Sequence, residues 1–340
     1  MKVAFDARPL SNPHGVGRYA RCLLGALRET AGESDELLET HRPSSFARTR
    51  GADVYHAPWM SGAMLHSPCP MVVTVHGLTA LRRRSEHLRD GLRLRLRNLA
   101  VQRAAGVIAP THAVAEDVLG ELGLERERIA VIPEAADPAM YPRSTDEITA
   151  VRERFALPSD YLVWVGGLQH PDPNRHVAEL AAAPRELPLV MVGSTQPWAH
   201  ELPCVILTGR VSDEHLAAIY SGAHALVLPS EGEGFGLPAV EALACGTPVV
   251  AFDCPALREA LGDRASFVAP GDMSALIGGA QSATRPAPAP AAWSWLDAAR
   301  ASWEVYHRAR ADAHGVRVSN APRRRHAGAR AARIDGLEPQ

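Results

Sequence analysis

Two acidic residues flank a glycine-rich turn in the second half of the chain. Glu233 lies in the turn, and Glu241 lies in the run of helix-forming residues that follows it. The glycines allow a tight backbone path that brings N–H groups close to a ligand, beside the positive end of the following helix dipole. Such a turn is predicted to bind an anion. Two carboxylates would repel a phosphate, so hydroxyl groups are their expected partners.

An anion held by backbone amides, with hydroxyls on either side, describes a nucleoside diphosphate sugar. In this interpretation one glutamate binds the ribose and the other binds the hexose. The alternative is a pair of solvated acids near a turn. The spacing of Glu233 and Glu241 alone favours that alternative, because acidic residues are frequent in this chain.

The elements that position this turn can be predicted from residue type. An apolar run ends at Pro229, a helix is expected from Pro238 to Cys245, and a second apolar run follows Gly246. Proline suits the first position of a helix, and glycine suits the left-handed position just after its end. Residues 226–251 are therefore predicted to form a strand, a loop, a helix and a second strand.

The residues from Ser230 to Val250 read S-E-G-E-G-F-G-L-P-A-V-E-A-L-A-C-G-T-P-V-V. This order resembles the donor-site signature of retaining glycosyltransferases of family GT4, which have the two-domain GT-B fold. The resemblance implies that Glu233 contacts the transferred sugar and that Glu241 holds the ribose. It also implies that three residues offer backbone amides to the donor, namely Phe235, Gly236 and Leu237.

A second glycine-rich stretch lies near the start of the chain. D-A-R-P-L followed by G-V-G-R-Y resembles the opening of the same family, in which this loop faces the donor diphosphate and the acceptor. Gly15 and Gly17 are therefore predicted to bind the donor. With Ala20 they also match G-x-G-x-x-A, the pattern of a dinucleotide-binding, NAD(P)-dependent oxidoreductase. That alternative expects an acidic residue at the end of a second strand about twenty positions later, and Asp35 and Glu36 follow no predicted strand.

Two histidines stand at the ends of predicted strands, in D-V-Y-H-A-P and in M-V-V-T-V-H-G. In open α/β sheets the carboxyl ends of the strands line the ligand crevice, so both are candidate site residues. His76 resembles the family histidine that lies beside the reacting sugar, which implies a catalytic role. His56 and the nearby Trp59 are candidates for an acceptor pocket, with packing as the alternative for each.

Phosphate contacts must fall to arginine, histidine or backbone, because lysine occurs once, at Lys2. In the family, the strand that corresponds to Tyr161–Gly167 is followed by a lysine that binds the diphosphate. Arg175 is the cation best placed to replace it here, and arginine is a good phosphate ligand. The segment G-R-V-S-D resembles one near the nucleoside base, which implies that Arg210 lines that pocket. A plain surface loop is the alternative.

The whole chain is predicted to be α/β, with two Rossmann-like domains whose parallel sheets face an interdomain cleft. An acceptor-side domain is expected at 1–145, a donor domain at 146–283, a linker with a helix that returns to the N-terminal domain at 284–310, and a disordered tail at 311–340. Residues 29–50 are polar and lack a clear apolar run. The N-terminal domain is therefore expected to be abbreviated, without a strand in this stretch.

Composition excludes several other classes of protein. The 340 residues carry a formal net charge of -2, which argues against a nucleic-acid binder. Five cysteines without a C-x-x-C pair argue against a zinc site or a disulfide framework, and no apolar run is long enough to span a membrane, so a cytoplasmic location is expected. Residues 86–103 predict a basic amphipathic helix. It suits an anionic membrane surface or, as the favoured interpretation, a surface helix with a solvated face.

These features predict an enzyme that moves a hexose from a nucleoside diphosphate sugar to a hydroxyl of a small-molecule or glycan acceptor, with retention of configuration. No metal or other cofactor is expected, since the helix dipole, the loop amides and Arg175 would offset the diphosphate charge. Abundant alanine and arginine with one lysine suggest a GC-rich bacterial source. The main alternative is a protein of the same fold that binds a nucleotide sugar without turnover.

Overall fold

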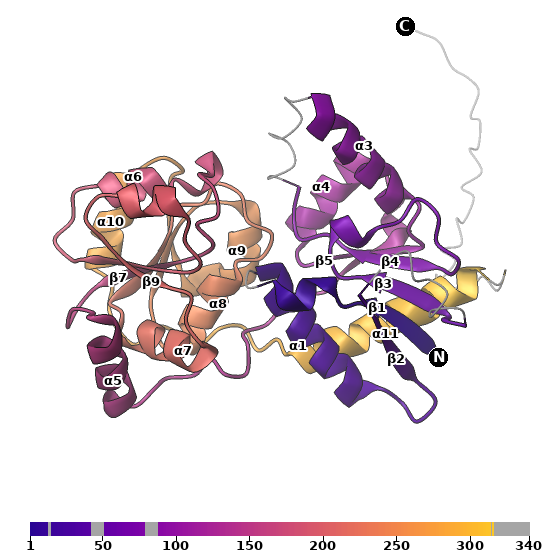
Figure 1. Ribbon diagram of the computed structural model, residues 1–340, viewed down its shortest axis with the longest axis horizontal. Helices are drawn as coiled ribbons and strands as arrows, with labels where there is room; N and C mark the ends of the chain where they lie inside the picture. The colour runs from indigo at the N-terminus through magenta and orange to yellow at the C-terminus, as the bar shows by residue number, and fades with distance from the viewer. Residues whose placement is uncertain (13–14, 42–50, 79–87, 314, 316–340) are drawn as a thin grey trace, which may run out of the picture.

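The computed structural model describes residues 1–12, 15–41, 51–78, 88–313 and 315, and in it the chain forms two α/β domains (Figure 1). Each domain is built on a six-stranded parallel sheet. The strand order is β2-β1-β3-β4-β5-β6 in the N-terminal sheet and β12-β11-β10-β7-β8-β9 in the second sheet. The predicted fold class, two Rossmann-like domains with parallel sheets, is confirmed.

The N-terminal domain contains the first six strands and four α-helices of the described residues. Its strands are β1 (Lys2–Asp6), β2 (Glu36–Thr40), β3 (Val54–Ala57), β4 (Met71–Thr74), β5 (Gly106–Ala109) and β6 (Ile129–Val131). Its helices are α1 (Gly15–Thr30), α3 (Leu88–Gln102), α4 (His112–Leu122) and α11 (Trp295–Ala313), with short 3-10 turns η1 (Arg8–Ser11), η3 (Met60–Gly62) and η5 (Arg126–Arg128).

The second domain follows the same plan of strands alternating with helices. Its strands are β7 (Leu162–Val165), β8 (Leu189–Val192), β9 (Val205–Gly209), β10 (Ala225–Leu228), β11 (Val249–Phe252) and β12 (Ser266–Val268). Its helices are α5 (Thr145–Phe155), α6 (Val177–Ala182), α7 (Asp213–Gly222), α8 (Leu237–Ala244), α9 (Pro255–Leu261) and α10 (Met273–Gln281), with 3-10 turns η6 (Pro173–Arg175), η7 (Pro197–Glu201) and η8 (Gly262–Arg264).

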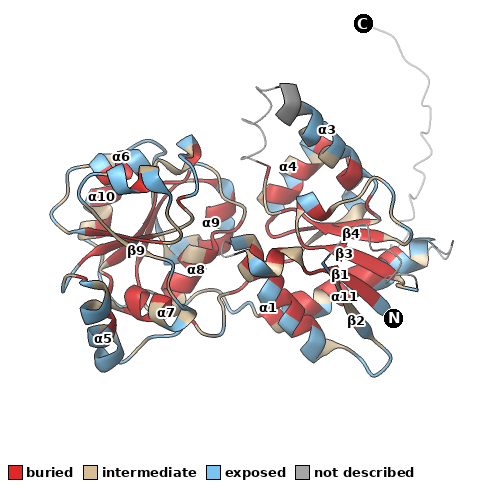
Figure 2. Ribbon diagram, in the orientation of Figure 1, coloured by how far each residue is buried: buried red, intermediate tan, exposed pale blue. Residues whose placement is uncertain are grey.

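The central strands are buried on both faces, as Figure 2 shows, which explains their continuous apolar sequences. β4 reads MVVT and β10 reads ALVL, and every one of these residues is buried. Parallel sheets covered by helices on both faces require such runs. Several covering helices begin at a side-chain cap: Thr111 accepts from the Val114 N–H, and Ser144 forms a capping box with Glu147.

The last described helix, α11, returns to the N-terminal domain as predicted. It packs against α1 and against β3, β4 and β5 (Figure 1). One face of the helix is buried, including Ala299 and Tyr306, and the indole of Trp303 donates to the Thr30 hydroxyl at 3.2 Å. The helix extends to Ala313, past the predicted boundary at Arg310. Most of the predicted tail lies outside the described residues.

One strand of the N-terminal sheet contradicts the sequence prediction. Glu36–Thr40 forms β2 and pairs with β1 along its whole length, although residues 29–50 were expected to contain no strand. β2 lies at the edge of the sheet, so its side chains are only partly buried and two leucines are enough apolar surface. Edge strands escape hydrophobic patterning because one side of them meets solvent. Residues 42–50 lie outside the described part of the chain.

Helix α3 lies on the surface, and three of its leucines point away from the core. Leu92, Leu96 and Leu99 are 61%, 43% and 48% exposed, whereas Ala100 and Val101 are buried. The helix therefore turns a leucine stripe outward, which differs from the favoured expectation of a solvated polar face.

Candidate active site

The glycine-rich turn follows β10 and leads into α8. Gly236 caps the helix in the left-handed region at φ +86°, and a Cβ there would lie 2.3 Å from Leu257 Cδ2. A Cβ on Gly234 would lie 1.7 Å from the carbonyl oxygen of His76. Only glycine fits either position, because the turn is held tightly against both its own domain and the end of β4. Helix α8 begins at Leu237, one residue before the predicted start, and Gly246 has the predicted left-handed conformation.

Further contacts join the carboxyl ends of the two sheets. The Thr111 hydroxyl, just after β5, donates to the Gly234 carbonyl at 3.1 Å. The Glu259 carboxylate of α9 accepts from the His112 and Ala113 N–H groups at 2.7 and 3.1 Å, so it caps a helix of the other domain. The turn thus lies where residues from both domains meet, as expected for a ligand site at the carboxyl ends of parallel strands.

The loop after β7 is tied to the same turn. The Asn174 carbonyl accepts from the Glu231 N–H at 2.9 Å, and His176 Nε2 lies 2.9 Å from Glu231 Oε1. Arg175 is 41% exposed, and its Nη1 would lie 3.2 Å from a Cβ on Gly166 at the end of β7. The structure therefore places the guanidinium of Arg175 beside the predicted diphosphate loop, with the carboxylate of Asp172 3.7 Å from its Nε.

The two glutamates of the turn have different surroundings. Glu233 is partly exposed, next to Gly234. Glu241 is buried on α8, where Arg18 Nε lies 3.0 Å from its Oε1. The contact is ionic but is not aligned as a hydrogen bond, so Oε1 keeps its capacity to accept one. Burial raises the pKa of Glu241 to about 7, although Arg18 acts to lower it.

Arg18 holds three carboxylates at once. Its other nitrogens pair with Asp137 Oδ2 at 3.1 Å and with Asp213 Oδ1, and its side chain is only 13% exposed. Asp137 lies in the segment that crosses between the domains, and Asp213 begins α7. We call Arg18, Asp137, Asp213 and Glu241 the Arg18 cluster. One positive charge in it faces three acidic groups.

His76 is bonded through both ring nitrogens. Nδ1 lies 2.9 Å from Glu134 Oε1 and Nε2 lies 2.9 Å from the Pro58 carbonyl oxygen. A carboxylate and a carbonyl only accept hydrogen bonds, so these two partners favour a ring that donates from both nitrogens, which is the imidazolium form. Burial lowers the pKa of His76, but the hydrogen bond and charge of Glu134 outweigh it, so the pKa lies above its ordinary value.

His56 does not line the site. It is fully buried, with Nδ1 2.6 Å from the Tyr306 hydroxyl and Nε2 2.9 Å from the Thr74 hydroxyl. Burial lowers the pKa of His56 to about 3, which keeps the ring neutral. The prediction of an acceptor role for His56 is therefore wrong. The side chain joins α11 to the sheet instead.

Two family models match the chain. The model described as Glycosyltransferase Family 4 matches residues 37–139, and the model described as Glycosyl transferases group 1 matches residues 159–283. The chain belongs to glycosyltransferase family 4. The two matched ranges cover most of the N-terminal sheet and all of the second sheet, so the resemblance read from residues 230–250 extends to both domains.

Curated relatives carry several transferase names. The 2-deoxystreptamine glucosyltransferase of Streptomyces kanamyceticus is 31% identical over 195 residues, which cover 52% of this chain and 50% of that protein. The D-inositol 3-phosphate glycosyltransferase of Mycolicibacterium smegmatis is 32% identical over 257 residues, covering 67% and 56%. The chain thus spans about half the length of these relatives.

Solved structures with the same fold are more distant in sequence. Anabaena HepE in complex with UDP and glucose has a TM-score of 0.64 at 18% identity, over 91% of this chain and 95% of that one. Sucrose-phosphate synthase from Thermosynechococcus elongatus has a TM-score of 0.65 at 19% identity, over 93% and 94%. At these identities the likeness establishes the fold of this family 4 chain and nothing finer.

The other predicted site residues of this family 4 member lie on several different elements. Gly17 is buried in the first turn of α1, one residue before Arg18, and Gly15 is exposed. Arg210 is exposed after β9, at the edge of the donor sheet. The indole of Trp59 donates to Asp6 Oδ2 at 2.8 Å beneath the Arg8 guanidinium, so it is at least partly a packing residue. Phe235 is buried against Trp293.

Sequence reasoning missed the partners that set the charge of the site. Arg18 stands within the quoted G-V-G-R-Y and Glu134 follows β6, but neither was predicted to be a site residue. Helical spacing places Arg18 on α1 but does not indicate which domain its side chain meets. The oxidoreductase alternative expects an acidic residue at the end of a second strand. Asp35 instead accepts a hydrogen bond from the N-terminal amine at 2.8 Å and precedes β2, at the opposite end of the sheet from the site.

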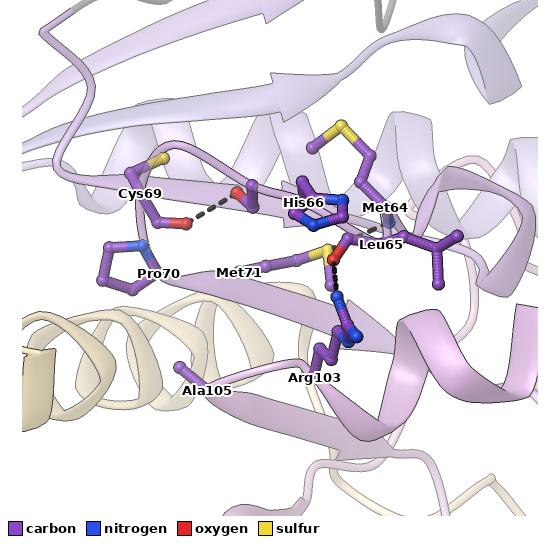
Figure 3. Close-up of a pocket in the computed structure, with 9 residues that line it drawn as sticks. Met64, Leu65, His66, Cys69, Pro70, Met71, Arg103 and Ala105 are labelled. Carbon is purple, nitrogen blue, oxygen red and sulfur yellow. Dashed lines mark hydrogen bonds between the residues drawn. The ribbon is translucent and has the colours of Figure 1, made fainter.

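A surface hollow of about 270 Å³ lies elsewhere, at the amino ends of β4 and β5 (Figure 3). Arg103 crosses it to donate to the Leu65 carbonyl at 2.7 Å. It opens on the opposite edge of the sheet from His76. Within the described ranges, no group of three or more histidine, cysteine or acidic side chains is arranged to hold a metal ion. No helix in that same part of the chain is long and apolar enough to cross a membrane.

Proposed function

We propose that this family 4 chain is a retaining glycosyltransferase that moves a hexose from a nucleoside diphosphate sugar to a hydroxyl of a small-molecule or glycan acceptor. The observation that carries the proposal is the contact of the Gly234 turn with the end of β4. In this contact Gly234, the residue after Glu233, lies against the backbone carbonyl of His76 of the other domain. The loop of Arg175 is bonded to the same turn.

The donor's charge is offset by two features of the second domain. The first turn of α8 presents N–H groups without a side-chain cap, at the positive end of the helix dipole. Arg175 adds a full positive charge beside Gly166. Glu241 is assigned to the ribose hydroxyls and Glu233 to the hexose hydroxyls. No resident metal or cofactor enters this proposal.

The reaction replaces one bond to the anomeric carbon by another. The bond from that carbon to the diphosphate oxygen breaks, and a bond to the acceptor oxygen forms on the same face of the sugar. The acceptor proton passes to the departing diphosphate, so atoms and charge balance without a protein nucleophile. Glu233 orients the sugar in this scheme, and the imidazolium of His76 offsets negative charge that develops on the departing group.

Thermal-shift measurements with UDP, GDP, TDP and their common sugars, and with NAD and NADP, test the donor assignment. A ligand at 100 times its dissociation constant stabilises the fold by about 2.7 kcal/mol. We expect one nucleoside diphosphate to stabilise the wild type but not Glu241→Ala. Stabilisation by NAD or NADP alone would contradict the proposal.

Turnover and stereochemistry are tested separately. Proton NMR of the product from an α-linked donor reports whether the new linkage is also α, as retention requires. A donor that binds without any transfer to a panel of sugar and aminocyclitol acceptors would favour the alternative of binding without turnover. A cytoplasmic location belongs to the same proposal. Its support is that all five cysteines are unpaired.

A further inference from the structure

The Arg18 cluster joins the two domains at the buried end of the donor site. Arg18 comes from α1 of the N-terminal domain, whereas Asp213 and Glu241 begin α7 and lie on α8 of the donor domain. The contact between α1 and α8 therefore passes through the carboxylate assigned to the ribose. When the domains separate, Glu241 loses its cation.

The neighbours of Glu241 are mostly acidic or neutral. Arg18 is the cation among them; the other groups that act on Glu241 are Asp137, Asp213, Glu134, Cys22, Tyr220 and Cys245. Burial raises the pKa of Tyr220, Cys22 and Cys245 above their ordinary values, so these three groups are neutral near pH 7. The charge on Glu241 thus depends on the balance between one arginine and the surrounding carboxylates.

We propose that Arg18 is a positioning residue of the donor site, which favours the ionised form of Glu241, aims its carboxylate at the ribose and makes donor binding depend on contact between the domains. This inference rests on the proposed function. The geometry supports it because Arg18 Nε approaches Glu241 Oε1 without occupying it as an aligned donor, which leaves that oxygen able to accept from a hydroxyl.

Opposite charge changes in the cluster give opposite results. We expect Arg18→Gln to weaken nucleotide binding about tenfold at pH 7 and to recover toward wild type by pH 9, since one pKa unit is a factor of ten. Asp213→Asn removes a competing carboxylate and should move the pH midpoint of binding to lower pH. Affinities for UDP, GDP and TDP are measured by calorimetry from pH 5.5 to 9. Titration of the diphosphate is common to all variants, so the difference between variants is the readout.

Arg28→Gln is the matched control, because Arg28 is an exposed arginine of the same helix that pairs with Glu39 away from the site. It should leave the midpoint unchanged. A purely structural role for Arg18 would weaken binding without moving the midpoint, and tighter binding by Arg18→Gln would mean that Arg18 competes with the ribose. Either result overturns the inference. If no nucleotide binds the wild type at any pH, the proposed function fails as well.

The leucine stripe of α3 carries a second, independent inference. Leu92, Leu96 and Leu99 are three of the five large hydrophobic side chains that are exposed in the described part of the chain. Their spacing places them on one face of the helix. Arg93 and Arg95 are also exposed and lie on either side of that face.

We infer that this face docks on an anionic lipid surface. The leucines can enter the membrane interface while the arginines beside them pair with lipid phosphates, which matches the charge and polarity of such a surface. A protein core would not accept the arginines. The binding is reversible, because the stripe is short. Docking through this face would hold the N-terminal domain at the lipid surface, and acceptors are expected to enter through that domain.

Sedimentation with phosphatidylcholine vesicles and with equimolar phosphatidylcholine and phosphatidylglycerol vesicles tests this inference. We expect binding to the anionic vesicles alone, loss of binding in high salt, and loss in the double variant Leu92→Ser with Leu96→Ser. Arg154→Gln with Arg264→Gln is a control for unspecific charge attraction, because it removes two exposed arginines of the other domain, and it should bind as the wild type does. Absent binding, or a leucine variant that instead changes the oligomeric state in light scattering, overturns the inference.

Discussion

Two buried glutamates of the site differ in how their charge is balanced. Glu134 is 3% exposed and has a partner of its own, His76, within the same domain. Glu241 is 2% exposed and shares Arg18, from the other domain, with two aspartates. A dedicated partner fixes the charge of a buried pair, whereas a shared partner leaves it adjustable. The N-terminal side of the site therefore has a fixed charge, and the donor side has a charge that pH and domain contact can change.

The largest effect should come from removing the adjustable carboxylate. We expect Glu241→Ala to weaken nucleotide binding on the order of 100-fold, because charge-assisted hydrogen bonds contribute about 1.5–3 kcal/mol each. Calorimetry with the nucleotide that binds the wild type measures this. Glu134→Ala is the comparison, since it should change affinity only a few-fold. Equal losses in the two variants would show that the two glutamates do not divide their roles as proposed.

The fixed pair should affect turnover more than binding. Glu134→Gln keeps the shape of the side chain but removes its charge, so the pKa of His76 should fall. We expect turnover to fall about tenfold while the donor dissociation constant stays near that of the wild type. Nitrogen-15 NMR of the imidazole reports its protonation directly. A neutral His76 at pH 7 in the wild type would contradict the assignment of an imidazolium.

The pH dependence of donor binding should follow Glu241. The pKa of Glu241, about 7, is raised above its value in the unfolded chain, so folding stability is lost as pH rises through 7 and the buried carboxyl ionises. Over the same pH range, nucleotide binding gains a charged hydrogen-bond acceptor. Affinity should therefore fall by up to about tenfold per unit below pH 7. Glu241→Gln should show only the titration of the nucleotide itself. A wild-type profile that matches this variant would remove the distinction between the two glutamates.

The smallest effect should come from the exposed contact between the domains. Glu259→Gln weakens the cap on α4 of the other domain, and we expect a loss of about 1 kcal/mol or less because the carboxylate is exposed. The midpoint of thermal unfolding measures this loss. Glu127→Gln, at an exposed turn, is the control. A large drop in donor affinity for Glu259→Gln would mean that domain contact acts through α9 as well as through Arg18.

Much of this architecture could be read from residue order. Buried parallel strands are continuous apolar runs, and the turn at Gly234 and Gly236 is marked by glycines that no other residue can replace there. The edge strand β2 could not be read in this way, because it carries only two leucines. His56 and His76 both end strands in similar patterns, yet one is buried under α11 and the other contacts the donor turn.

The two sheets, the donor turn and the family could be predicted from residue order, since they depend on local propensity, hydrophobic period and a long ordered motif. The charges of the site depend instead on how the folded domains pack. Arg18 meets Glu241, Asp137 and Asp213 because α1 and α8 come together across the domain boundary, and Glu134 meets His76 because β4 and β6, on either side of β5, end on the same side of the N-terminal sheet. Pairings between residues far apart in the chain depend on how the layers pack, and no local pattern encodes them.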